Sequence, residues 1–415
     1  SEQWSDQFRL ADRATPFASR RERGFRFGQV STGLELTAQW RGEVAGLANW
    51  QVFGVDVARH EFEGLREGQE TNLATGASTP VILGEVFPLR DFPNTRATEL
   101  GLFWQDEVRL GHGWALVPGL RWEHYRLDAR PDAVWREDNP TVTPVSLDSS
   151  RFTPKLGLRW SGERLDVYAQ YARGFRAPPF GDVNIGLNLP AFNYVALPNP
   201  DLRPETSDGY ELGLRWAGDV LQASVAVYEN RFEDLIESRA NRGRNAEGQL
   251  VFQSINRDRA RIRGAELEAR WYLDAWLPAT PGWYVDLSAA WSRGEDTARD
   301  QPLNSVPPGR ASLAAGYAAP DGGWGSELRV TGVRRVDRAD QTAAALYLPP
   351  GYSTWDAHAW WSIGEQVRLN LTLHNLADRR YWDWATLRGL AATADDVDFY
   401  SRPGRGASLG LRVEF

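Results

Sequence analysis

Apolar and polar side chains alternate along much of this chain with a period of two. Between Val367 and His374, Val and Leu occupy every second position, and Arg, Asn, Thr and His occupy the others. The segment from Tyr352 to Ile363 repeats the pattern, with Trp, Ala and Ile set against Thr, Asp, His and Ser. Because successive side chains of a β-strand point to opposite faces, this alternation predicts strands with one apolar and one polar face.

The same pattern predicts about sixteen strands, an even number, distributed over the whole chain. They are expected near residues 3–10, 24–41, 49–61, 98–110, 114–128, 149–160, 165–175, 206–216, 220–236, 260–273, 283–294, 309–318, 324–335, 351–363, 367–376 and 405–415.

The connections between these strands alternate in length. Short turns are expected at 111–113, 161–162, 217–219, 320–323 and 364–365, and long connections at 65–97, 129–148, 176–205, 237–259, 295–308, 336–350 and 377–404. The short turns all fall at one end of the hairpins, as in outer-membrane barrels, which have short periplasmic turns and long extracellular loops. The sequence therefore predicts one all-β domain over residues 1–415, a transmembrane antiparallel β-barrel of about sixteen strands.

The amino-acid composition agrees with an outer-membrane barrel and excludes several classes of function. The 415 residues carry 47 Lys and Arg against 55 Asp and Glu, a formal net charge of −8, so nucleic acid is not an expected partner. Mean hydropathy is −0.48, and no run of about 18 apolar residues predicts a membrane-spanning helix. The 19 Trp, 13 Tyr and 17 Phe suit the aromatic girdles of a barrel. Cysteine is absent, and no serine or carboxylate stands beside a histidine in a recognisable hydrolase setting, so neither a metal site nor an enzyme is expected.

The C-terminal segment ends on an apolar file. Ala407, Leu409, Leu411, Val413 and Phe415 alternate with small or polar residues. This file resembles the terminal strand by which bacterial outer-membrane proteins are recognised, so we expect the barrel assembly machinery to be a partner through the Phe415 strand. An ordinary amphipathic edge strand is the alternative. The chain starts at a serine and contains no methionine, which favours a processed, truncated or engineered chain.

Two proline-containing boxes bracket the connection at 176–205. Phe175-Arg176-Ala177-Pro178 opens it, and Asn199-Pro200-Asp201-Leu202-Arg203-Pro204-Glu205 closes it. Proline lacks a backbone N–H and interrupts a strand ladder, and Asn and Asp close turns on their own backbone. The punctuation predicts a well-defined loop, but by itself it indicates no ligand.

At these boxes the chain resembles the barrel of TonB-dependent outer-membrane receptors, in particular the haem/haemoglobin receptor group. Receptors of that group carry a Phe-Arg-Ala-Pro box and an Asn-Pro-Asn/Asp-Leu-x-Pro-Glu box around one extracellular loop. Further matching segments are 101–107, 264–268 and 373–381. The resemblance implies a place in the bacterial outer membrane and energy-coupled import of an iron-bearing ligand, with haem as the candidate transported ligand.

The chain departs from that family pattern in two ways. The resemblance implies an N-terminal plug domain and a barrel of about twenty-two strands, whereas this chain has no plug-like segment and about sixteen predicted strands. Several haem receptors also place a histidine between the two boxes, but residues 179–198 contain none. Tyr194 is the only residue in that interval able to ligate iron strongly.

Four residues are candidate ligand-binding groups: Arg176, Tyr194, Asn199 and His60. Haem binding requires an axial ligand, expected from Tyr194 or from His60 near the mouth, and cations such as Arg176 for the propionates. The polar faces of the strands predict the pore lining. Its members are Asp106, Arg121, Asp166, Asp356, His358, Arg368 and His374.

The predicted activity of the chain as written is that of a passive pore, because it has no coupling element; no cofactor is required, and contact with TonB is not expected. A fragment of a haem or siderophore uptake receptor is the alternative, and a soluble all-β binding protein is the third hypothesis. A closed pore requires hydrogen bonds between the first and last strands.

Membrane lipid and lipopolysaccharide are the expected partners of the outer wall. Arginine-rich stretches such as 334–338 are available for binding phosphates or for charge pairing within their own loops.

Overall fold

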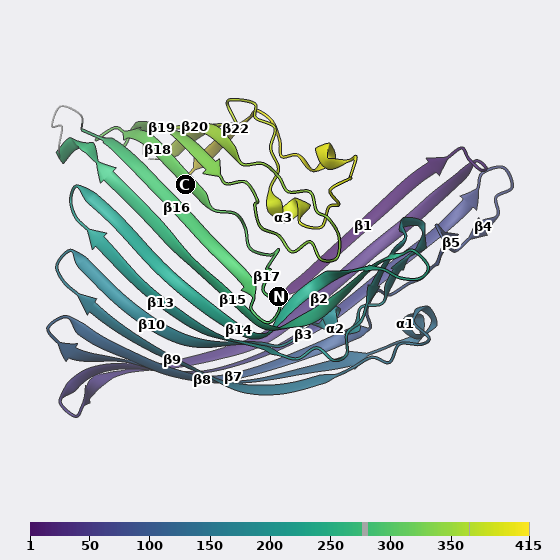
Figure 1. Ribbon diagram of the computed structural model, residues 1–415, viewed down its shortest axis with the longest axis horizontal. Coiled ribbons are helices and arrows are strands. Elements are labelled where there is room, and N and C mark those ends of the chain that lie inside the picture. The colour runs from purple at the N-terminus through teal and green to yellow at the C-terminus, as the bar shows by residue number, and fades with distance from the viewer. Residues whose placement is uncertain (276–280, 365, 415) are drawn as a thin grey trace.

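The computed structural model describes residues 1–275, 281–364 and 366–414. Most of their strands form one large, curved and mainly antiparallel sheet (Figure 1), and two short strands form a separate pair. The large sheet has 20 strands over the described ranges, which confirms the predicted all-β class, and sixteen of them have eight or more residues. They are β1 (Glu2–Arg13), β2 (Ser19–Val44), β3 (Leu47–Asn72), β7 (Asn94–Gly111), β8 (Trp114–Arg130), β9 (Leu147–Ser161), β10 (Leu165–Arg176), β13 (Glu205–Ala217), β14 (Leu221–Arg244), β15 (Leu250–Tyr272), β16 (Trp283–Asp296), β18 (Arg310–Ala318), β19 (Trp324–Val333), β20 (Tyr352–Ile363), β21 (Val367–His374) and β22 (Gly406–Val413).

Short elements lie in the connections. The short strands are β4 (Ser78–Thr79), β5 (Val81–Ile82), β6 (Glu85–Val86), β11 (Leu187–Leu189), β12 (Tyr194–Leu197) and β17 (Gln301–Pro302). The helices are α1 (Ala133–Asp138), α2 (Phe180–Asn184), α3 (Trp384–Leu387) and the 3-10 turns η1 (Pro190–Phe192), η2 (Leu273–Ala275) and η3 (Val397–Tyr400). Across the described residues, every helix is too short or too polar to cross a membrane.

Loop lengths are sorted by end, as the sequence predicts. The β2–β3 turn consists of Ala45 and Gly46, both with positive φ, and the other short turns lie at the same end of the sheet. The predicted connection at 237–259 is wrong in extent, because β14 continues to Arg244 and β15 starts at Leu250. Register shifts between Glu237 and Ala240 and between Asn241 and Arg244 interrupt the alternation there, so the pattern did not predict the strands.

The sheet ends in two edge strands, β1 and β22. Over the described ranges β1 pairs with β2 and β22 pairs with β21, and the expected hydrogen bonds between the first and last strands are not formed. Since β1 reaches only Val30 of β2, residues 32–44 of β2 have a ladder on the β3 side alone. Phe415, on which the assembly-machinery prediction depends, and Glu365 of the predicted 364–365 turn lie outside the described residues.

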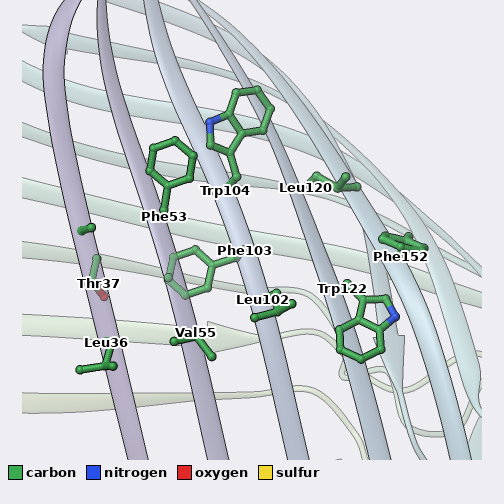
Figure 2. A pocket seen from close by; sticks show the side chains of 12 residues that line it. Leu36, Thr37, Phe53, Val55, Leu102, Phe103, Trp104, Leu120, Trp122 and Phe152 are labelled. Carbon is green, nitrogen blue, oxygen red and sulfur yellow. The ribbon is translucent and has the colours of Figure 1, made fainter.

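The two faces of the sheet differ in chemistry. Figure 2 shows apolar side chains from neighbouring strands that line a shallow depression of about 660 Å³ on one face. One row of direct strand partners in this depression is Leu36, Val55, Leu102, Trp122 and Phe152. Leu36 and Phe152 are 57% and 61% exposed. Such a face is suited to lipid, whereas the opposite face carries ion pairs and suits an aqueous interior.

At the long-loop end the connections fold back and form a small core. Its buried members are Ala97, Leu127, Val183, Leu202 and Ile236. Val183 comes from α2 and Leu202 from the second proline box, so this core fixes the 177–204 loop against the ends of β7, β8 and β14. Phe180 of α2 stacks on Phe62 of β3 at 4.2 Å between ring centroids.

Candidate functional site

The two proline boxes meet at the long-loop end of the sheet. Arg176 ends β10 and Glu205 begins β13, and the two residues are direct partners in the antiparallel register. The Arg176 Nη1 atom lies 3.4 Å from Glu205 Oε1, and Glu205 Oε2 accepts a hydrogen bond of 2.8 Å from the backbone N–H of Ile236. The Glu205 side chain is 10% exposed and that of Arg176 is 46% exposed. Glu205 therefore closes the base of the loop, while Arg176 still reaches solvent.

The second box is anchored on the β14–β15 hairpin. Asn199 donates from Nδ2 to the carbonyl of Ser254 (2.8 Å) and accepts at Oδ1 from the N–H of Asp201 (3.1 Å). Asn256 of β15 accepts from the N–H of Arg203 and donates to its carbonyl, both at 2.9 Å. Both the oxygen and the nitrogen of the Asn199 amide thus form hydrogen bonds to the backbone. Asn199, a predicted ligand-binding residue, therefore stabilises the conformation of the loop.

The α2 helix attaches the same loop to its other neighbours. Asn184 is 1% exposed, and its side-chain amide accepts from the N–H of Val145 (2.8 Å) and donates to the Val145 carbonyl (2.9 Å). Asp182 accepts a 2.7 Å hydrogen bond from Ser238. The loop between the boxes is consequently tied to both the 131–146 connection and β14.

A pocket of about 490 Å³ lies among the loops of this end. The Arg66 side chain and residues of segments 84–91, 137–142, 186–190 and 195–198 form its wall. Arg66 is held by Glu85 Oε1 at 2.6 Å and by Asp91 Oδ1 at 3.0 Å. Burial, reinforced by the charge of Asp91, raises the pKa of the Asp138 carboxyl to about 6. The pocket is therefore acidic, and its one buried guanidinium is already paired.

His60 and Tyr194 lie in different surroundings. The His60 Nδ1 atom is 2.8 Å from Ser31 Oγ, and its ring stacks near Phe62. Tyr194, on β12, stacks on Phe252 at 5.2 Å between ring centroids, in the parallel pairing of β12 with β15. Neither residue lines the loop pocket. Within the described part of the chain, no group of three or more His, Asp or Glu side chains is arranged to hold a metal ion.

Six of the seven predicted lining residues share the polar face. Arg121 binds Asp56 with two hydrogen bonds of 2.7 and 3.0 Å, and its Nε donates to Glu123. Asp166 lies 4.0 Å from Arg159. The Arg121–Asp56 pair reaches across β7 from β8 to β3, and the Arg159–Asp166 contact joins the paired strands β9 and β10.

The remaining members of this face belong to β20 and β21. Asp356 accepts a 2.8 Å hydrogen bond from the N–H of Asn375 at the end of β21, and His374 Nε2 lies 3.1 Å from Ser408 Oγ. Both residues therefore fasten the strand ends near the last long loop.

Trp360 separates the other two lining residues of this region. The His358 ring lies 5.6 Å from one ring of Trp360, and the Arg368 guanidinium lies 5.4 Å from the Trp360 centroid. Arg368 thus makes a cation–π contact on the polar face.

Asp106 is placed differently. It is 4% exposed, and its Oδ2 accepts from Asn49 (2.6 Å) and Gln51 (3.2 Å). Strand alternation puts Asp106 on the same side of β7 as the exposed Leu102, so the structure does not place it among the lining residues. The carboxylate is instead retained by amide donors on the apolar side of the sheet.

Several residues that shape the long-loop end of the sheet were not predicted from the sequence. Asp132 is the N-cap of α1, and its side chain accepts a hydrogen bond from the Trp135 N–H. Aspartate is a preferred N-cap residue, so the sequence could have indicated this helix start. Arg66 and Asn184 join segments far apart in the chain, and no local pattern signals such contacts.

Residues 2–376 match the family described as TonB dependent receptor-like, beta-barrel. The chain belongs to this family, and its sheet is the wall of an outer-membrane barrel.

Curated relatives and solved structures agree with that assignment. Hemoglobin-haptoglobin utilization protein B of Neisseria meningitidis serogroup A is 24% identical over 75% of this chain and 44% of its own length. Lactoferrin-binding protein A of Neisseria meningitidis serogroup B is 26% identical over 67% of this chain and 33% of its own. The chain thus spans less than half the length of these relatives. The copper transporter OprC has the same fold, with a TM-score of 0.75 at 19% identity over 100% of this chain and 61% of its own.

Proposed function

We propose that this chain forms the wall and ligand-facing loops of an outer-membrane receptor that takes haem from a haem-carrying protein. The single observation that carries the proposal is the fixed geometry of the 177–204 loop, which Glu205, Asn199 and Asn184 hold in place at the extracellular rim. A loop held in one conformation loses little entropy on binding. The names of the haemoglobin-binding relatives supply the ligand class.

The loop also presents chemistry that suits a protein ligand. Phe192, in this loop, is 67% exposed, and Tyr194, two residues further along, is half-buried. Exposed aromatic side chains on a rigid support are frequent anchors of protein interfaces. Arg176 remains accessible to a propionate, and Tyr194 remains the proposed iron ligand, with haem as substrate and not as a resident cofactor.

The passive pore is the second candidate, and the ion-paired concave face favours it. We prefer the receptor because the family match and the haemoglobin-binding relatives support it. TonB, the barrel assembly machinery and lipopolysaccharide are the proposed partners of the whole protein.

Binding by the membrane-inserted chain tests the proposal. The chain in lipid nanodiscs is titrated with haemoglobin, lactoferrin and free haem, and the variants Phe192→Ala and Phe152→Ala are compared. Both phenylalanines are exposed, at 67% and 61%, but Phe152 lies on the lipid-facing row. We expect haemoglobin binding that Phe192→Ala weakens roughly tenfold or more and Phe152→Ala leaves unchanged. Absence of haemoglobin binding by the inserted chain, together with stable current steps in planar bilayers, would favour the pore instead.

A further inference from the structure

An arginine-lined pocket of about 340 Å³ lies where β16 meets the 334–351 connection. Its charged wall consists of Arg293, Arg334, Arg335, Arg338 and Asp337, and Trp291 lies at its lower edge. Arg293 and Glu295 follow Trp291 at every second position of β16, so all three point to the same side of the strand. Trp291 is 44% exposed, which places this side on the outer wall.

The cluster has more cations than its carboxylates can pair. Glu295 is shared by three arginines: Arg293 at 2.6 Å, Arg261 at 3.0 Å and Arg338 at 3.3 Å. Arg334 has a contact of 3.7 Å with Asp337, a long distance for an ion pair. Five arginines, counting Arg335, therefore face two carboxylates among these residues. A guanidinium with unused N–H groups is suited to bidentate binding of phosphate.

The pocket continues into an apolar depression of about 620 Å³ on the same wall. Trp291, Gly309 and Arg334 line both. A Cβ atom placed on Gly309 would lie 3.5 Å from Arg334 Cδ and 3.6 Å from Trp291 Cδ1, so the two side chains flank the glycine. The part nearer the membrane centre is lined by Val225, Leu267, Ala289 and Ala311. A cationic site suited to phosphate thus lies directly above an apolar groove, with an aromatic residue of the interfacial girdle between them.

We propose that this surface is a binding site for a phosphorylated lipid of the outer leaflet, with the phosphate on the arginines and an acyl chain in the depression. The order of the parts along the wall, guanidinium above indole above aliphatic side chains, complements the order of groups in such a lipid. The depression in Figure 2 is an internal comparison, because it has a similar apolar lining but no arginine among its lining residues.

Native mass spectrometry of the full chain in detergent tests this site. The ligands are lipid A with two phosphates and its dephosphorylated form, each with and without excess inorganic phosphate. The site variant is Arg334→Gln with Arg338→Gln. The matched control is Arg126→Gln with Arg231→Gln, two exposed arginines on the outer side of other strands.

We expect the wild-type chain to bind bisphosphorylated lipid A roughly tenfold more tightly than the dephosphorylated lipid. The site variant should lose that preference and the control variant should keep it. Equal binding of the two lipids by the wild-type chain, or an equal loss in the control variant, would overturn the proposal. Displacement of the lipid by inorganic phosphate would show a site for free phosphate and would also overturn it.

Discussion

Removal of the Glu205 carboxylate should release the loop between the two boxes. In Glu205→Ala the buried N–H of Ile236 loses its acceptor at 2.8 Å, and Arg176 loses its partner at 3.4 Å. A hydrogen bond to a charged group is worth about 1.5–3 kcal/mol when its partner is left buried. The ion pair adds less than about 1 kcal/mol because Arg176 is half exposed. Local opening should therefore become easier by about 2–4 kcal/mol.

Hydrogen exchange of the membrane-inserted chain measures this change. At about 1.4 kcal/mol per factor of ten, the N–H of Ile236 should exchange roughly 30-fold faster or more. Glu205→Gln keeps an oxygen for Ile236 and should change exchange less than roughly fivefold. The control is Asp201→Ala, an exposed carboxylate in the same box, for which no change is expected. Unchanged exchange in Glu205→Ala, or an equal increase in the control, would refute the proposed role of Glu205.

Three further outcomes follow from the structure. The pKa of Asp138 is raised to about 6, so the folded loop favours the protonated carboxyl. The stability of segment 133–142 should therefore fall as pH rises from about 4 through about 6. Asp138→Asn should slow hydrogen exchange of that segment at neutral pH and remove the pH dependence of the segment's stability. Leu371→Arg, on the apolar side of β21, should cost about 2–4 kcal/mol of folding free energy in vesicles if Leu371 lies near the midplane of the membrane. Thr372→Arg, on the polar side, should be tolerated. Equal costs for the two variants would contradict the assignment of the faces. In absorbance titrations with haem, Tyr194→Phe should weaken binding more than His60→Ala, and the reverse order would move the iron ligand to His60.

The strands were predictable because their signal is local. The structure has β16 at Trp283–Asp296, within two residues of the range expected from alternation alone. The upper halves of β14 and β15 were missed because the register shifts at Glu237 and Asn241 disturb the alternation, and because β12 pairs with β15 across a long sequence separation.

The candidate site was predictable only in outline. The proline boxes indicated a defined loop, and they do bracket it. The roles of their residues depend on partners that are distant in sequence: Ile236 for Glu205 and Ser254 for Asn199. The predicted place of Asp106 in the pore lining is wrong, because Asp106 has the same parity in β7 as Leu100, Leu102 and Trp104, and strict alternation puts it on the apolar face. Period-two patterns specify which face a residue occupies but not which backbone group its side chain satisfies.

Site-specific photocrosslinking tests the central claim most directly. A benzophenone amino acid replaces Phe192, in the loop between the boxes, or Asp321, in the short β18–β19 turn at the other end of the barrel. Cells that display the chain in their outer membrane are irradiated with haemoglobin present. The account predicts a crosslink to haemoglobin from position 192 and none from position 321. A crosslink from position 321 alone, or none from position 192 while haemoglobin is bound, would contradict it.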